Sequence, residues 1–139
     1  MMPKARSSLL TAALVAMSCL SAASRVLAED DCCDPAGPFA PGENVADRRA
    51  TCETIGYWLD RAPETQARIT MVITGPLVSI SEDEALAHLI MCEPAGVQVM
   101  CVTYGTGDFA PGEVATFAGG FSRAGEGRIM LDPCLASRG

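Results

Sequence analysis

The sequence predicts a mainly β domain preceded by one α-helix, and three observations support this fold class. From Gln66 onward, apolar and polar residues alternate with a period of two, which is typical of strands with one buried face. Turns rich in glycine and proline separate the alternating segments. Before Pro63, by contrast, apolar residues recur at helical spacing.

Residues 1–28 have the composition of a secretory signal peptide. A basic head at Lys4 and Arg6 is followed by an apolar run over residues 9–20, and the stretch ends in compact side chains up to Ala28. The apolar run is shorter than the roughly 20 residues of a membrane span, and no later segment approaches that length. We therefore expect an exported protein, periplasmic or secreted, with no membrane span.

The leader also has a second interpretation. Ala16-Met17-Ser18-Cys19 places a small residue before a cysteine at the end of the apolar run, as lipoprotein processing requires. Cys19 would then be lipidated, and the chain would be anchored to a membrane by its N-terminus. Because Ala16 stands where a branched aliphatic residue is usual, soluble export is favoured over this lipid anchor.

Removal of the leader leaves a strongly acidic chain. The leader contains Lys4, Arg6 and Arg25, so the remaining 111 residues keep 7 Arg, no Lys and all 17 Asp and Glu, a net charge of −10. A protein that neutralises phosphates needs clustered Lys and Arg. The charge therefore argues against nucleic acid and anionic membrane surfaces as partners, whereas cationic partners or metal ions stay open. The length is that of one domain with a buried core.

Two segments precede the expected β domain. Residues 29–43 hold three prolines and five acidic residues without periodicity, and we expect an acidic, proline-rich arm that is extended and loosely held. Residues 44–62 are expected to form the N-terminal helix, since Asn44 can cap it. Tyr57 and Trp58 near its end are expected to pack on the domain, and a binding platform is the alternative.

Residues 66–136 contain the expected strands. The first is one long strand from about residue 66 to residue 80 that is bent at Gly75, a device by which small barrels turn a corner. The other clear strands are expected at residues 97–104, 113–121 and 128–132.

Residues 81–92 have two interpretations. Residues 81–84 (SEDE) match a capping box, and the alanines and leucines after them favour a helix. Residues 93–96 (EPAG) match a type I turn, which would fold the preceding chain back onto residues 97–100 as a hairpin. We favour a short strand over about residues 87–92, preceded by an acidic turn.

Six cysteines follow the leader, and in an exported protein their default role is a disulfide framework. They are Cys32, Cys33, Cys52, Cys92, Cys101 and Cys134. No pair has C-x-x-C spacing and His88 is the only histidine, so the sequence gives poor support to a thioredoxin-like redox site or a zinc site. We expect no metal and no cofactor.

Four segments within residues 66–136 carry a resemblance to a known fold. In chain order they are ITGPLVSI, VQVMCVTY, PGEVATFAGG and RIMLDPC. Their order resembles bacterial OB-fold domains of the tRNA-anticodon-binding-like type, which include exported OB-fold proteins of cell envelopes. Such domains are five-stranded Greek-key barrels. The resemblance therefore implies a small five-stranded OB-like Greek-key barrel, preceded here by one α-helix.

The resemblance also implies a first disulfide. In the OB barrel the third and fifth strands are neighbours, which would bring Cys101 and Cys134 together. This bond would close a loop of about 34 residues and stabilise the fold by roughly 3–4 kcal/mol in the chain-entropy model.

The other four cysteines have less defined partners. Cys52 on the helix and Cys92 on the barrel are candidates to tether the helix, with one of Cys32 and Cys33 as a further participant. Since they are adjacent, Cys32 and Cys33 are expected to bond to different partners.

OB-fold domains commonly bind oligonucleotides or oligosaccharides on the face of their second and third strands. Nucleic-acid binders of this kind combine a basic groove with stacking aromatic residues. Tyr104 is the only aromatic residue on the corresponding strands, and Arg68 and Arg128 are too few to form a groove. The resemblance therefore does not extend to a nucleic-acid role.

Catalytic arrangements have little support in the sequence. Ser79, Ser81 and Cys92 are near His88 only along the chain, and spacing cannot show a positioned nucleophile or an orienting carboxylate. The acidic residues beside the first cysteines lack EF-hand spacing, and a solvated arm is the better interpretation. These residues are Glu29, Asp30, Asp31 and Asp34.

Three functions remain open from the sequence. The favoured one is an exported, disulfide-stabilised, OB-fold-like binding module that is not an enzyme and whose partner is an unknown protein, glycan or small ligand. The first alternative is a membrane-anchored envelope accessory or stress lipoprotein. The second alternative is a small hydrolase or metal-dependent enzyme that uses His88.

Overall fold

The computed structural model describes residues 32–94 and 96–139. The expected leader, the lipidation candidate Cys19 and the acidic residues 29–31 lie outside the described residues. The described part is mainly β, as the sequence predicts, with one short helix. The strands are β1 (Phe39–Pro41), β2 (Ala50–Thr51), β3 (Ile69–Glu82), β4 (Ala87–Met91), β5 (Gln98–Thr103), β6 (Val114–Gly125) and β7 (Arg128–Arg138), and the helix is α1 (Ile55–Asp60).

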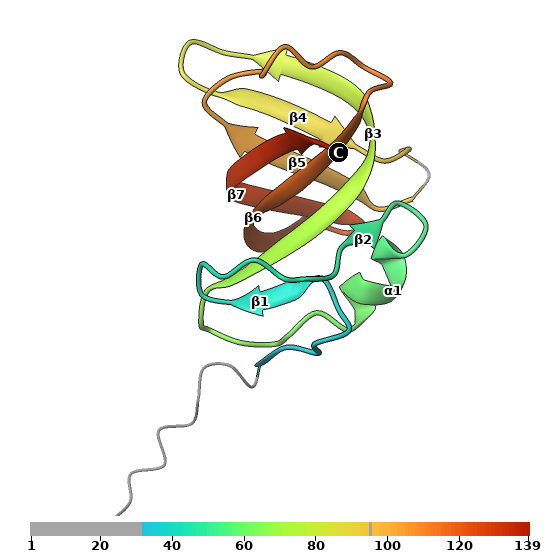
Figure 1. Ribbon diagram of the computed structural model, residues 1–139, viewed down its shortest axis with the longest axis vertical. Helices are drawn as coiled ribbons and strands as arrows, with labels where there is room; N and C mark the ends of the chain where they lie inside the picture. The colour runs from blue at the N-terminus through green and yellow to red at the C-terminus, as the bar shows by residue number, and fades with distance from the viewer. Residues whose placement is uncertain (1–31, 95) are drawn as a thin grey trace, which may run out of the picture.

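Strands β3 to β7 form a closed five-stranded barrel, which occupies the centre and top of Figure 1. The strand order is β3-β4-β5-β7-β6, and β6 pairs with β3 to close the ring. All these pairs are antiparallel except β5 with β7. β7 lies between β5 and β6 in the barrel, although it follows β6 in the chain. This is a Greek-key arrangement and is consistent with an OB-like fold. The predicted fold class is confirmed.

The long first barrel strand is confirmed, and its glycine has a steric role. β3 runs without a break through Gly75 and Pro76, and its register against β4 shifts between Leu77 and Ser79. A Cβ atom on Gly75 would lie 2.6 Å from the Cys52 sulfur. Gly75 therefore lets β3 pass close to a disulfide that ties the α1 region to the barrel.

β3 has different partners in its two halves. Its first residues pair with β1 in antiparallel and with β2 in parallel orientation. From Leu77 onward the same side of β3 pairs with β4, while β6 pairs with β3 from Thr70 to Pro76. Figure 1 shows β1 beside the lower end of β3 and β2 farther up along the same strand.

The core is built from the inward-facing residues of all five barrel strands. In β4, for example, Ala87, Leu89 and Met91 are buried while His88 and Ile90 between them are only half-buried. This is the period-two pattern of a strand with one face in the core. The largest buried side chains on the barrel are those of Met71, Ile73, Leu77, Leu89, Met91, Val99, Phe117, Ile129 and Leu131. Ile55 and Leu59 of α1 pack into the same cluster.

The helix is much shorter than the expected range of residues 44–62. Asn44 does not cap it; the residue at the N-cap is Thr54, and residues 50–51 form β2 instead. The physical reason is that β3 offers these residues a pairing edge, and Cys52 is bonded to Cys92. Val45, which belonged to the expected apolar stripe of the helix, is 65% exposed.

The described part of residues 29–43 is not a loosely held arm, so this expectation is wrong. Pro38, Phe39 and Ala40 are buried, and the Val72 amide donates a hydrogen bond to the Pro38 carbonyl at 3.0 Å. The Phe39 ring packs edge-on against Phe121, with ring centroids 5.1 Å apart. These apolar contacts and the pairing of β1 with β3 outweigh the acidic composition of the segment.

The strand preferred over about residues 87–92 is confirmed as β4 (Ala87–Met91), which pairs with β5 as a hairpin, and in the turn the Gly96 amide donates to the Glu93 carbonyl. β7 is longer than the expected residues 128–132, because it continues through Pro133 to Arg138 along β6. The register of this pair shifts between Gly119 and Phe121. A proline lacks an amide donor and is tolerated at such an irregularity.

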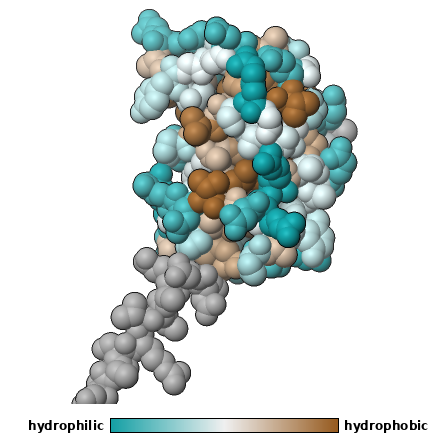
Figure 2. Space-filling view, in the orientation of Figure 1, coloured by the Kyte–Doolittle hydropathy of each residue, from teal (hydrophilic) through white to brown (hydrophobic). Residues whose placement is uncertain are grey.

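Hydrophobic and hydrophilic side chains are interleaved on the face of the molecule shown in Figure 2. The hydrophobic groups form small patches between hydrophilic ones, and no continuous apolar area extends across this face. Any apolar binding surface on this face is therefore small.

Candidate functional site

The catalytic candidate His88 lies half-buried on β4, opposite Ser81 of β3 and Val102 of β5. Among the described residues no hydrogen bond joins His88 to another side chain. The nearby Asp83 accepts hydrogen bonds from the Leu86 and Ala85 amides, which lower the pKa of its carboxyl group. The charge of His88 adds a smaller effect in the same direction. The serine, histidine and carboxylate do not form a triad.

The acidic and cysteine residues do not assemble a metal site in the part of the chain that the structure describes. No group of three or more His, Cys, Asp or Glu side chains lies close enough there to hold an ion. Asp34 instead accepts a hydrogen bond from the Ala36 amide, and the acidic turn at residues 82–84 is exposed.

The outer face of β4, β5 and β7 carries a row of three long apolar side chains. Ile90 pairs with Met100, and Met100 pairs with Met130, so these side chains lie side by side on three neighbouring strands. All three are half-buried. We call them the methionine row. Ile90 and Met100 of the row line a hollow of about 370 Å³, together with Gln98, Ala124, Arg128 and Ile129.

The polar and aromatic residues singled out on the OB binding face are not brought together. Arg128 lines the hollow beside the methionine row, where it pairs with Gln98 across the strands. Tyr104 follows the end of β5 and is 86% exposed. Arg68 lies just before β3 and lines a separate hollow. The structure therefore offers neither a basic groove nor a stacking platform on this face.

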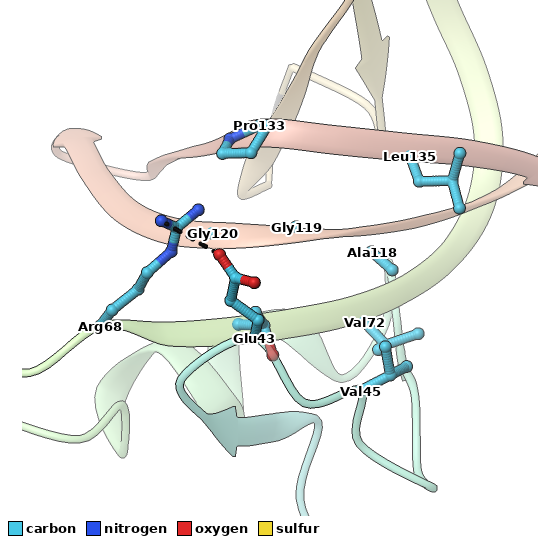
Figure 3. Close-up of a pocket in the computed structure, with 10 residues that line it drawn as sticks. Glu43, Val45, Arg68, Val72, Ala118, Gly119, Gly120, Pro133 and Leu135 are labelled. Atoms are coloured by element: carbon cyan, nitrogen blue, oxygen red, sulfur yellow. Dashed lines mark ion pairs between the residues drawn. The ribbon is translucent and has the colours of Figure 1, made fainter.

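A second hollow lies over the central strand of β3, β6 and β7. Val72, Ala118 and Leu135 pair across the three strands, and the next residues of β6 are Gly119 and Gly120. Small side chains on the middle strand leave a depression between larger ones on either side. Its volume is about 280 Å³, and the segment after β1 forms its remaining wall through Glu43 and Val45. We call this hollow the β6 trough (Figure 3).

The β6 trough has one charged end and one apolar end. Arg68 and Glu43 form an ion pair at 3.6 Å near Gly120, and their side chains are 50% and 83% exposed. Figure 3 shows this pair at one end and Val45, Val72, Ala118 and Leu135 grouped at the other. An ion pair this exposed contributes little to stability, so both charges are free to exchange partners.

Sequence reasoning missed both hollows. The run Ala118-Gly119-Gly120 lies within a strand, and glycine in a strand often marks a close approach or an unfilled space. That signal was present, but the strand was expected to end there. The methionine row depends on the register between β4, β5 and β7, which no single segment encodes.

Tyr57 and Trp58 have separate environments. Trp58 is half-buried against the core and packs over Gly37, where an added Cβ atom would lie 2.8 Å from the indole ring. Tyr57 is 53% exposed, and the Arg61 guanidinium lies 3.7 Å from its ring centroid. The two rings do not form a flat platform, because they meet at an interplanar angle of 88°.

Cys101 is bonded to Cys134, the pair that the OB resemblance implies. The bond joins β5 to β7, with 5.4 Å between the two Cα atoms, and both residues are buried. It connects parallel neighbours whose chain positions are 33 residues apart.

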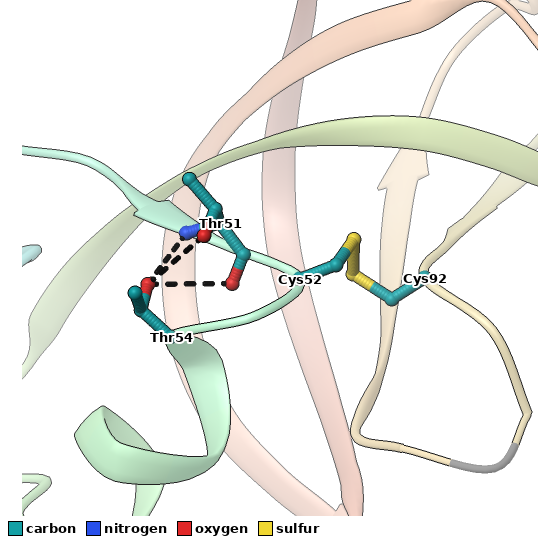
Figure 4. Close-up of a disulfide and its surroundings, with 4 residues drawn as sticks. All are labelled: Thr51, Cys52, Thr54 and Cys92. Carbon is teal, nitrogen blue, oxygen red and sulfur yellow. Dashed lines mark hydrogen bonds between the residues drawn. A yellow bond between two sulfur atoms is a disulfide. The ribbon is translucent and has the colours of Figure 1, made fainter.

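Cys52 is bonded to Cys92, with 5.4 Å between the Cα atoms. The bond ties the turn before α1 to the end of β4, as shown in Figure 4. In that turn the Thr51 amide donates a hydrogen bond of 2.9 Å to the Thr54 hydroxyl. The link is the one expected to tether the helix to the barrel.

Cys32 and Cys33 are bonded to each other, so the expectation of different partners is wrong. Among the described residues, the other four cysteines pair with one another, so Cys32 and Cys33 are the two that remain. The two Cα atoms are 3.7 Å apart.

No model of a known protein family matches the chain, and a search of curated proteins finds no similar one. In the described residues, no helix has the length and hydrophobicity that crossing a membrane requires.

Proposed function

We propose that this protein is an exported, non-enzymatic binding module of the OB-fold type, which holds an apolar segment of a partner protein against the methionine row. The barrel and its disulfides support the proposal, because a rigid scaffold lowers the entropic cost of binding. Three disulfides also suit an oxidising, extracellular compartment.

The single observation that carries this proposal is the methionine row itself. Ile90, Met100 and Met130 stay half-buried on the outside of a sheet whose inner face already fills the core. Methionine side chains are flexible and polarizable, so they adapt to apolar partners of varied shape. A glycan site would require an aromatic side chain for stacking and several polar groups. The residues that line this hollow include no aromatic residue, and its long polar side chains are those of Gln98 and Arg128.

The charge of the domain supports a partner with cationic groups around its apolar segment. Residues 32–139 contain 14 Asp and Glu against seven Arg, a net charge of −7. Complementary charge around an apolar contact raises the association rate and selects among partners.

The proposal is tested by comparing two single variants, one in each hollow. Met100→Gln removes the centre of the methionine row and is expected to weaken partner binding about tenfold, as for a central interface residue. Leu135→Gln, at an exposed position of the β6 trough, serves as the matched control. A photo-crosslinking residue at position 90 identifies the partner in envelope extract, and titration of that purified partner then gives the affinities. Equal affinities for both variants would contradict the proposal.

The proposed export has its own test in the N-terminus of the native protein. Residues 1–28 are expected to be removed, so that the intact mass corresponds to a chain beginning at Glu29 with six fewer hydrogens than the reduced form. Mass spectrometry of protein purified from its natural host measures both quantities. A diacylglycerol group on Cys19 would instead establish the anchored alternative.

A further inference from the structure

We infer that the β6 trough is a second ligand site, separate from the methionine row, and that it binds a small apolar zwitterion of the kind represented by a free aliphatic α-amino acid. Three properties of the trough support this inference. Its floor is formed by glycines that have no room for a side chain, it carries one positive and one negative side chain, and its apolar wall is exposed to solvent.

The floor is kept low by the backbone of the neighbouring strand. A Cβ atom on Gly119 would lie 2.9 Å from the Cys134 Cα atom, and one on Gly120 would lie 2.7 Å from the Asp132 carbonyl oxygen. Neither position can carry a side chain without displacing β7. The volume of about 280 Å³ equals the share of about nine water molecules in the liquid, which suits a ligand of about ten non-hydrogen atoms.

The two charges select a zwitterion over a simple anion or cation. Arg68 and Glu43 are the charged residues that line the trough, and their charged groups are 3.6 Å apart. A carboxylate bound to Arg68 alone would be repelled by the nearby Glu43 carboxylate. An amine bound to Glu43 alone would be repelled by the Arg68 guanidinium. An α-amino acid carries both charges one carbon apart, so its carboxylate can bind Arg68 while its ammonium group binds Glu43.

The exchange replaces one exposed ion pair with two. Since Arg68 and Glu43 are 50% and 83% exposed, opening their own pair costs little. The Arg68 guanidinium presents a fork of donors that fits a carboxylate in bidentate geometry.

The apolar end accounts for the ligand's side chain. Val45 and Leu135 are 65% and 70% exposed, which ranks them among the most exposed large hydrophobic residues of the described chain. Both line the trough together with Val72 and Ala118. An aliphatic side chain of four carbons placed there would remove apolar surface of both partners from water.

The inference is tested by NMR titration of the oxidised protein with leucine into the millimolar range. The amide signals of Ala118, Gly119 and Gly120 are expected to shift in a saturable manner. N-acetyl-leucine lacks the ammonium charge and leucinamide lacks the carboxylate, so each is expected to bind about tenfold more weakly. Glycine, which lacks the apolar side chain, is expected to bind more weakly than leucine as well.

Variants then assign the two charges. Arg68→Gln and Glu43→Gln are each expected to weaken leucine binding about fivefold to tenfold, and Ala118→Leu is expected to abolish it by filling the trough. Met100→Gln, on the other hollow, is the control that keeps the affinity unchanged. An unchanged amide spectrum elsewhere shows that each variant is folded.

Three outcomes overturn the inference: no saturable shift at the trough, equal affinities for leucine and its two analogues, or shifts confined to the methionine row. Loss of partner binding at Met100 leaves this result untouched, so failure of the proposed function and failure of the second site are distinguishable.

Discussion

Replacement of both Cys101 and Cys134 by alanine is expected to lower the free energy of unfolding by at least about 3–4 kcal/mol. The bond joins residues 33 apart in the chain, and the chain-entropy model assigns this stabilisation to the loop it closes in the unfolded state. Both residues are buried, so loss of the sulfur atoms from the core adds to the effect. Since small domains are stable by only about 5–15 kcal/mol, the variant loses a large part of its stability. Guanidinium unfolding measures the difference.

The matched control is the double replacement of Cys32 and Cys33 by serine. That bond joins adjacent residues, so the unfolded chain gains little freedom when it is removed. The free energy of unfolding is expected to fall by about 1 kcal/mol, the value that the chain-entropy model gives for the shortest possible loops. Similar losses for both double variants would show that loop closure is not the source of the stabilisation.

Gly119→Ala is expected to destabilise the protein by about 2–3 kcal/mol. The added methyl group would lie 2.9 Å from the Cys134 Cα atom and close to the Pro133 carbonyl, and both are backbone groups that cannot rotate away. Relief requires β6 to separate from β7 at the point where their register shifts. Overpacking of this kind typically costs 1–3 kcal/mol, and the upper part of that range applies because no flexible side chain can absorb the strain.

Gly56→Ala is the matched control for this substitution. Gly56 lies in α1, and an added Cβ atom there meets no heavy atom within 4 Å. Alanine is favoured over glycine in helices by up to about 1 kcal/mol, so this variant is expected to be slightly more stable. Thermal unfolding followed by circular dichroism compares the two variants. A neutral Gly119→Ala would mean that the strands tolerate a side chain at the floor of the β6 trough.

The barrel was predictable because each of its strands carries its own local signal. Period-two alternation predicted β5, the turn residues at 93–96 favoured a strand over a helix for β4, and the long first strand through position 75 is present. The Cys101–Cys134 bond was implied by the resemblance to OB-fold domains, in which the third and fifth strands are neighbours. Such features are encoded within short segments or in the sequence of segments.

The N-terminal third was predicted less well because its structure depends on distant residues. Residues 50–51 are strand because β3 provides an edge, and Phe39 is buried because Phe121 provides a surface. Helical spacing and acidic composition are local properties, so neither indicates the pairing of β2 with β3 or the packing of Phe39 on Phe121. The candidate binding hollows were missed for the same reason, because each is formed across three strands.

The pairing of β1 and β2 with β3 has a consequence for self-association. Without these two short strands, the first third of β3 would be an unpaired strand edge, with donors and acceptors open to any other β-strand. Exposed strand edges of this kind recruit further chains and begin aggregation. The segment around residues 38–51 therefore covers this edge of β3 within the same molecule. The Cys52–Cys92 bond at the end of the segment fixes it to the barrel. The covered edge of β3 and the acidic charge are therefore both expected to oppose aggregation.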